Sequence, residues 1–186
     1  VDQRGTIIPV NGLATDLLAR PDARIVALFG AGVQARSQLE AMCAVRAVSE
    51  VRVYDRASAQ AQAFIADVQA QPWSPQHMVV AATPEEALKD ADIVVTATTA
   101  TEPVFPGSAL GRGVHINGIG SHAPGARELD EETVLRAKVV VDFRAACLQE
   151  AGDIIIPIQK GSFSAERIHA ELGEIVLGRI EGRTSA

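Results

Sequence analysis

A glycine-rich turn contains the residues of this chain that are best suited to chemistry. It reads Gly30, Ala31, Gly32, Val33, Gln34 and Ala35, between an apolar run over 24–29 and a helical segment over 33–47. Gly30 permits a tight turn off a strand, and Gly32 lets a pyrophosphate approach the backbone. The first N–H groups of the helix would face the phosphates, aided by the helix dipole. The first five residues of the turn are therefore predicted to bind a dinucleotide, although the same residues would also suit a compact turn that binds nothing.

An acidic residue at the end of the next predicted strand supports the dinucleotide interpretation. Asp55 follows the apolar strand over 50–54. A carboxylate at this point accepts hydrogen bonds from the ribose hydroxyl groups and repels a 2′-phosphate, which favours NAD. Arg56 keeps NADP open, because its guanidinium could bind a phosphate, stack on adenine or lie solvated in the loop. Asp55 and Arg56 are both predicted cofactor-binding residues.

Two later loops follow predicted strands and would lie at the same edge of a parallel sheet. Thr98 and Thr99 come after the strand over 92–97, where their hydroxyl groups would suit a nicotinamide ribose or would simply cap free backbone groups. The next loop supplies Asn117, Gly118, Ile119 and Gly120. Its two glycines would allow a nicotinamide to lie flat against the backbone. Both loops are therefore predicted to contact the cofactor.

His122 is the predicted catalytic residue, because it is the histidine that follows a strand at the expected cofactor edge. Beside a nicotinamide, its imidazole could move a proton as a hydride moves. The alternative is a loop histidine that hydrogen-bonds its own turn. The four histidines are far apart in the sequence and none has a histidine partner four residues away, so no metal site is predicted.

The alternation of apolar strands with helical segments predicts the fold class. Strands are expected over 24–29, 50–54, 78–80, 92–97, 114–117 and 138–142. Helices are expected over 11–19, 33–47, 58–69, 84–88, 131–137, 144–150 and 165–177, with Asn11 as the N-cap of the first. This pattern indicates an α/β fold with a doubly wound parallel sheet of Rossmann type. We expect a lead-in segment and helix over 1–20, an NAD(P)-binding Rossmann domain over 21–178 and a C-terminal tail over 179–186.

Composition restricts the class of protein. A chain of 186 residues that is 47% hydrophobic has room for one well-cored domain. The net charge of −6 gives no basic surface for nucleic acid, and no apolar run reaches the roughly 18 residues of a membrane span. Cys43 and Cys147 form no C-x-x-C pair, which favours buried thiols in a reducing compartment. We expect a cytoplasmic protein without nucleic-acid or membrane partners.

Two motifs beyond the glycine turn resemble those of the ornithine cyclodeaminase/mu-crystallin family. They are Asn117 to His122, followed by Pro124 and 127–130, and the segment 173–178 with 182–184. The resemblance covers nearly the whole chain from Asn11 onward. It implies a homodimeric enzyme whose subunit joins an NAD(P)-binding Rossmann domain to a substrate domain. Members exchange hydride between nicotinamide and a carbon bearing an amine or imine, as cyclodeaminases, amino-acid dehydrogenases or cyclic imine reductases.

The resemblance also implies residue roles. Val33 and Gln34 would contact the pyrophosphate, Asp55 the adenosine ribose and Thr98 the nicotinamide side, while the residues from Asn117 to Gly120 would line the nicotinamide pocket. Ornithine cyclodeaminases have an aspartate where this chain has His122, which favours an amino-acid dehydrogenase or imine reductase. The family's catalytic lysine and carboxylate-binding arginine belong to a substrate domain that this chain lacks, so the chain alone is expected to bind cofactor without turnover. The alternative is a non-catalytic NAD(P)-binding or ligand-binding protein of mu-crystallin type.

Overall fold

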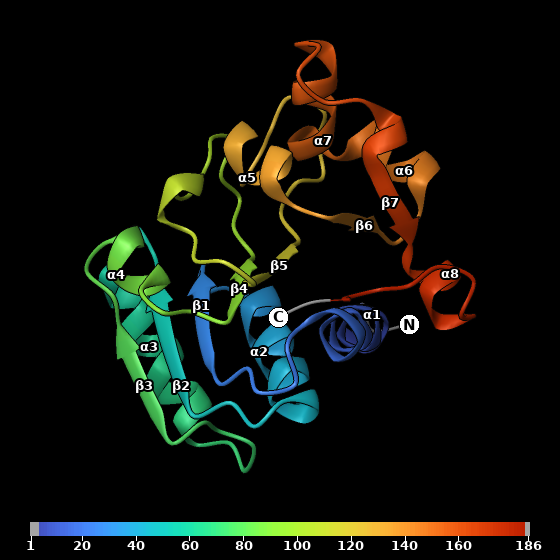
Figure 1. Cartoon of the computed structure of the whole chain (residues 1–186). Coiled ribbons are helices and arrows are strands. Elements are labelled where there is room, and N and C mark those ends of the chain that lie inside the picture. Colours follow the sequence, from blue (N-terminus) through green and yellow to red (C-terminus); the bar gives the residue numbers. More distant parts are fainter. Residues whose placement is uncertain (1–3, 185–186) are drawn as a thin grey trace.

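The glycine turn follows the central strand of a five-stranded parallel sheet. The computed structural model describes residues 4–184 (Figure 1). The sheet has the strand order β3-β2-β1-β4-β5, and all neighbouring strands are parallel. The strands are β1 Ile25–Phe29, β2 Glu50–Tyr54, β3 His77–Val80, β4 Ile93–Thr96 and β5 His115–Gly118. Because the order reverses between β1 and β4, a ligand crevice is expected beyond the carboxyl ends of these strands.

Helices cover both faces of this sheet, as the sequence predicts. They are α2 Val33–Val45, α3 Ser58–Gln69 and α4 Pro84–Leu88. Val26 and Leu28 of β1 join the core formed with α2 and α3. Ala27 and Phe29 enter a second core together with residues of α4. With apolar residues on both faces, β4 is buried along its whole length. The predicted α/β fold with a Rossmann-type parallel sheet is confirmed.

Helix α1 spans Arg4–Leu18 and begins earlier than the sequence predicts. The prediction that Asn11 caps its N-terminus is wrong, because Asn11 lies within the helix. Its Nδ2 donates a hydrogen bond of 2.7 Å to Oε1 of Gln38 in α2. The Asn11 side chain therefore joins α1 to α2 instead of capping the start of a helix. Figure 1 shows α1 beside α2, on the same side of the sheet.

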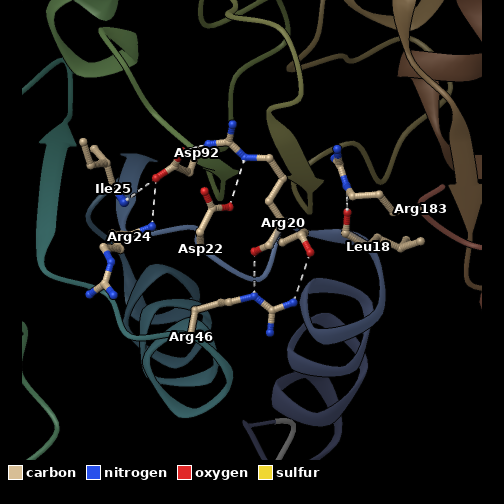
Figure 2. Close-up of polar contacts among 9 residues, drawn as sticks. Leu18, Arg20, Asp22, Arg24, Ile25, Arg46, Asp92 and Arg183 are labelled. Carbon is tan, nitrogen blue, oxygen red and sulfur yellow. Dashed lines mark hydrogen bonds and ion pairs between the residues drawn. The ribbon is translucent and has the colours of Figure 1, made fainter. Parts of the chain in front are cut away.

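An arginine just after α2 fastens the end of α1. The guanidinium of Arg46 donates to the carbonyl oxygens of Thr15, Asp16, Ala19 and Arg20 at 2.8–3.1 Å. It also pairs with the Asp16 carboxylate at 2.9 Å. Figure 2 shows Arg46 against the carbonyl of Arg20. The last carbonyl groups of a helix lack hydrogen-bond donors within the helix, and the guanidinium of Arg46 provides such donors at the end of α1.

The amino ends of β1 and β4 are joined by Asp92. Its Oδ2 accepts the N–H groups of Arg24 at 2.8 Å and Ile25 at 3.0 Å, and its Oδ1 pairs with the guanidinium of Arg20 (Figure 2). Nearby, Nε of Arg183 donates to the carbonyl of Leu18 and brings the C-terminal end of the described chain against α1. These contacts stabilise the amino ends of the central strands, at the end of the sheet opposite the glycine turn.

The predicted sixth strand does not join the main sheet. It pairs in parallel with a strand that the sequence did not predict. The predicted helix over 165–177 is therefore wrong from 165 to 171, whereas its part over Leu172–Val176 is helical. Ile168 and Ala170 are buried and their neighbours are partly exposed, which is the period of a strand. The spacing of Ile168 and Leu172 also fits a helix, so periodicity alone was ambiguous. These elements are β6 Val139–Val141, a short 3-10 turn Ala165–Arg167, β7 Ile168–Glu171 and α8 Leu172–Val176.

Three helices surround this small sheet and form a third core. They are α5 Glu131–Arg136, α6 Arg144–Glu150 and α7 Gly152–Gln159. The first two confirm predicted helices, whereas α7 was not predicted. Val134 of α5, Ile154 of α7 and Ile168 of β7 meet in this core. No helix in the described part of the chain is long and apolar enough to cross a membrane.

Candidate functional site

A cleft of about 540 Å³ opens beside the glycine turn. Its walls come from the loops after β1, β2 and β4, which are far apart in the sequence. The predicted cofactor-binding residues that line it are Gly30, Ala31, Gly32, Asp55, Arg56, Thr98 and Thr99. The cleft therefore brings together the phosphate, ribose and threonine elements of the predicted site.

The two glycines of the turn have different surroundings. Gly30 has φ +95°, and a Cβ at this position would lie 2.4 Å from the carbonyl oxygen of Ala97. The close approach of the loops after β1 and β4 therefore excludes any side chain at Gly30. A Cβ at Gly32 would meet no atom within 4 Å. The fold itself does not require glycine at position 32, which leaves open space for an external group to approach the backbone.

The first turn of α2 presents backbone donors that no side chain caps. Gly32 is its N-cap residue and makes no side-chain hydrogen bond. Val33, the first helical residue, is 74% exposed. The first N–H groups of a helix have no intrahelical acceptors and lie at the positive end of the dipole, so they bind anions readily. Gln34 is half-buried behind them. The arrangement fits a pyrophosphate.

Asp55 links the end of β2 to the glycine turn. Its Oδ2 accepts the N–H of Ala31 at 3.1 Å, and its Oδ1 accepts the N–H of Ala57 at 2.9 Å. The side chain is only half-buried, so each oxygen keeps acceptor capacity toward the cleft. Arg56 lines the same cleft and is exposed. A carboxylate and an adjacent cation thus line the same cleft, and the predicted contact of Asp55 with a ribose stays a prediction.

A second cavity, of about 370 Å³, lies along β5 and the small sheet. The predicted residues that line it are Asn117, Gly118, Ile119 and His122. Val33, Gln34 and Gly120 line neither cavity. The structure therefore divides the predicted site residues between a cleft bounded by the loops after β1, β2 and β4 and a cavity that lies along β5.

The amide of Asn117 belongs to a buried polar network. Its Nδ2 donates to Oγ1 of Thr15 in α1 at 2.9 Å, and its Oδ1 lies 3.2 Å from Nε2 of His115. Burial lowers the pKa of His115 to about 4, so the ring is neutral and Nε2 carries the proton that Asn117 accepts. The Asn117 side chain thus ties β5 to α1. Its predicted contact with a nicotinamide stays a prediction.

His122 is exposed at the mouth of the second cavity. Its Nδ1 lies 2.5 Å from the carbonyl oxygen of Gly120, and its backbone N–H donates to the same oxygen at 2.9 Å. A carbonyl oxygen only accepts hydrogen bonds, so the proton of the neutral ring lies on Nδ1. Nε2 then carries the lone pair, and it is the nitrogen available to accept a proton.

A buried carboxylate that the sequence analysis did not assign holds two of the site loops. Glu128 is 0% exposed. Its Oε1 accepts the N–H of Thr98 at 2.6 Å and the Thr98 hydroxyl at 2.7 Å, while its Oε2 accepts the N–H of Gly120 at 2.6 Å. Glu128 lies between Arg127 and Leu129, before three consecutive acidic residues over 130–132, and such a pattern usually indicates a solvated charged segment. Only the tertiary fold reveals the contact.

Asp153 supports Glu128 from the first turn of α7. Its Oδ1 accepts the backbone N–H groups of Glu128 at 2.8 Å and Leu129 at 2.9 Å. Burial, and to a smaller degree the charge of Glu128, raise the pKa of Asp153 to about 6. A Cβ at Gly118 would lie 3.6 Å from Asp153 Oδ2, so this carboxyl reaches the end of β5. Its position before an apolar run was a signal that could have marked a helix start.

The described residues favour neither metal nor thiol chemistry. Among residues 4–184, no group of three or more His, Cys, Asp or Glu side chains could hold a metal ion. Burial raises the pKa of the Cys43 thiol to about 12 and that of Cys147 to about 11. Both thiols are therefore protonated at neutral pH and are poor nucleophiles.

Known reductases and dehydrogenases are similar to this chain in sequence and in structure. A curated Delta(1)-pyrroline-2-carboxylate reductase from Bacillus cereus is 42% identical over 175 residues, which is 94% of this chain and 53% of that protein. A structure of the Thermococcus litoralis reductase of the same name, in complex with NADH and L-proline, matches with TM-score 0.91 and 42% identity over 97% of this chain and 57% of that one. An archaeal alanine dehydrogenase dimer with bound NAD matches with TM-score 0.88 and 34% identity, over 96% and 54%.

The chain spans about half the length of the curated relatives that it matches. The family model for ornithine cyclodeaminase/mu-crystallin proteins covers residues 8–186. That range includes the glycine turn, the loops after β4 and β5, and the small sheet. The chain belongs to the ornithine cyclodeaminase/mu-crystallin family.

Proposed function

We propose that this chain is the cofactor-binding part of an NAD-dependent enzyme that exchanges hydride at the amino or imino carbon of a small amino acid or cyclic imine. The observation that carries the proposal is the open space at Gly32, where the uncapped first turn of α2 faces a cleft that also contains Asp55. Backbone donors suit the two phosphates, and the carboxylate suits the adenosine ribose.

We propose positions for the two halves of the dinucleotide from the strand order. The ADP-ribose half belongs over β1 and β2, where Gly32 and Asp55 lie. The nicotinamide half belongs over β4 and β5, beside Thr98 and the loop that begins at Gly118. The carboxylate of Asp55 disfavours a 2′-phosphate, so we propose NAD over NADP, with Arg56 as the residue through which NADP could still be accepted.

We propose His122 as the residue that handles a proton. When bound, a reduced nicotinamide supplies hydride to an imine carbon, and the imine nitrogen must then take up a proton. The imidazolium form donates a proton from Nε2 in that direction, and the neutral imidazole accepts one there in the reverse direction. The Nδ1 contact with the carbonyl of Gly120 would orient the ring and leave Nε2 for this exchange.

The relatives suggest the substrate class and the assembly. The B. cereus relative is named as a reductase of Delta(1)-pyrroline-2-carboxylate, and the T. litoralis structure contains L-proline. We therefore propose a cyclic imino acid as substrate for the whole protein. The archaeal alanine dehydrogenase is a dimer, which supports the proposal of a homodimer.

The test is a pair of titrations followed by a turnover assay. The protein is titrated with NADH and with NADPH while nicotinamide fluorescence is recorded, and we expect tighter binding of NADH. NADH oxidation is then followed with Delta(1)-pyrroline-2-carboxylate in the whole protein. Binding with turnover supports the enzyme, binding without turnover supports the non-catalytic alternative, and no binding of either nucleotide contradicts the proposal.

A further inference from the structure

The carboxylate of Glu128 is the shared anchor of the two loops that face the nicotinamide half of the proposed site. One loop follows β4 and contributes Thr98, and the other follows β5 and contributes Gly120. Each loop donates a backbone N–H to a different oxygen of the same carboxylate, and the Thr98 hydroxyl adds a third bond. Glu128 accepts in all three contacts, which is the pattern of an ionised carboxylate. Such charge-assisted bonds are short and strong.

The surroundings leave Glu128 little freedom to move. Its backbone N–H donates to Asp153 at 2.8 Å, and its carbonyl oxygen accepts the N–H of Val104 at 2.8 Å. A Cβ at Gly120 would lie 2.5 Å from Cδ of Glu128 and 2.4 Å from the carbonyl oxygen of Thr98. The loop after β5 therefore fits closely around the carboxylate, and the separation of the two loops is set by the width of one carboxyl group.

We infer that Glu128 is a positioning residue for the nicotinamide ring: it contacts no substrate, and it sets the spacing and orientation of the loops at Thr98 and Gly120. The inference rests on the proposed function. It separates two roles within one cofactor site, because the ADP-ribose half would depend on Gly32 and Asp55, which make no hydrogen bond with Glu128 among those found in the described residues.

The substitution Glu128→Gln tests this with almost no change in shape. Glutamine offers one acceptor oxygen and one NH₂ group, so either Thr98 or Gly120 would face a second donor instead of an acceptor. We expect the affinity for NADH to fall by about tenfold or more, while the affinity for ADP-ribose changes by less than about twofold. ADP-ribose lacks the nicotinamide, so it reports on the other half of the site alone.

Asp130 provides a matched control two residues away. Its carboxylate also accepts two N–H groups and one hydroxyl, from Gly107 at 2.7 Å and from Thr133 at 2.8 and 2.6 Å. It caps α5 and holds no site loop. Asp130→Asn should therefore lower the melting temperature without changing the ratio of NADH to ADP-ribose affinity. An equal loss of that ratio in both variants would reduce Glu128 to a structural role and overturn the inference.

The remaining outcomes are also decisive. If Glu128→Gln binds NADH and ADP-ribose in the wild-type ratio, the inference is overturned while the proposed function stands. If the wild-type protein binds neither compound, the proposed function itself is contradicted. Should Glu128→Gln fail to fold, Thr98→Val removes the hydroxyl bond to Glu128 together with the bond that the N–H of Ala100 donates to the same hydroxyl. We expect a smaller loss that is again confined to NADH. An unchanged ratio in Thr98→Val overturns the inference in that case.

Discussion

The loop after β1 and the loop after β5 both contain glycines and both face a cavity. They differ in the space around one of these glycines. At Gly32, an added Cβ would meet no atom within 4 Å. At Gly120, an added Cβ would lie within 2.5 Å of the carboxylate of Glu128. The first loop leaves room for a group from outside the protein, whereas the second is filled by a group from inside it.

The carboxylates that contact these loops differ in the same way. Asp55 gives the first loop one acceptor at 3.1 Å, to Ala31, and it is half-buried in a cleft. Glu128 gives the loops around it three bonds of 2.6–2.7 Å and is 0% exposed. If the proposed site is correct, its phosphate side is completed by the ligand, while its nicotinamide side is largely formed before any ligand binds.

The largest effect is expected when a methyl group is added to the filled loop. Gly120→Ala would force Cβ against Thr98 and Glu128, and relief requires the two loops to separate. We expect a loss of about 3 kcal/mol in the free energy of unfolding, measured by urea denaturation. Gly125→Ala is the control, because a Cβ at Gly125 meets nothing within 4 Å. Equal stability of the two variants would show that the second loop is not filled.

The open loop should respond in the opposite way. Gly32→Val places a branched side chain where the pyrophosphate would approach, and we expect NADH affinity to fall by about a hundredfold, or about 2.7 kcal/mol. The free energy of unfolding should fall by only about 1 kcal/mol, because valine is a poor N-cap. Calorimetric titration and urea denaturation measure the two quantities.

Gly32→Ser sharpens this test. Serine is a good N-cap, so its hydroxyl can accept a first-turn N–H of α2 and should keep or raise stability. The same hydroxyl occupies the donors that a phosphate would use, so NADH binding should still weaken. Normal NADH binding by both variants would mean that the first loop is open without being a phosphate site.

The sequence allowed both loops to be predicted as site loops, but it did not predict the carboxylate that fills the second. Gly30, Gly32 and Asp55 form a local pattern of turn, helix and strand end, and each residue acts close to where it stands in the chain. The role of Glu128 depends on Thr98, thirty positions away, and on burial that no neighbouring residue signals. A charged side chain in a polar segment is ordinarily exposed, and only the packed fold shows otherwise.

The secondary structure elements also differ in how well the sequence predicts them. The runs that form β1 and β4 are continuously apolar, and burial on both faces makes such runs recognisable. The segment around Ile168 has apolar residues at spacings that fit both a strand and a helix, and pairing with β6 decided in favour of the strand. Asn11 has the chemistry of a cap, but a longer helix placed it against Gln38.

Acid titration should reveal the buried charges near the second loop. The folded-state pKa of Asp153 is raised to about 6, above an unfolded value near 3.8, so the folded protein binds the extra proton between these pH values. Its ionisation therefore lowers stability as pH rises through about 4 to 6. Asp153→Asn removes this penalty, and its stability relative to wild type should rise by about 2 kcal/mol between pH 4 and pH 7.

His115 gives the opposite dependence and serves as the control. Its folded-state pKa is lowered to about 4 from 6.5, so the neutral ring stabilises the fold at neutral pH and this stability is lost as pH falls from about 6.5 toward 4. His115→Gln should therefore gain stability relative to wild type at low pH. Denaturation with urea at several pH values measures both. A pH-independent difference for Asp153→Asn would contradict the burial of this charge.

The smallest effect concerns cofactor choice at the open loop. Asp55→Asn keeps one acceptor oxygen, so the contact with either Ala31 or Ala57 persists and stability should fall by only about 1 kcal/mol. The charge that opposes a 2′-phosphate is gone, and we expect the ratio of NADPH to NADH affinity to rise by about tenfold. The double variant with Arg56→Ala identifies the source of that change. If Arg56 binds the added phosphate, the double variant loses the gain. If repulsion by Asp55 is the whole cause, the gain persists. An unchanged ratio in Asp55→Asn would mean that the ribose does not lie at the end of β2, and the assignment of the open loop to the ADP-ribose half would be wrong.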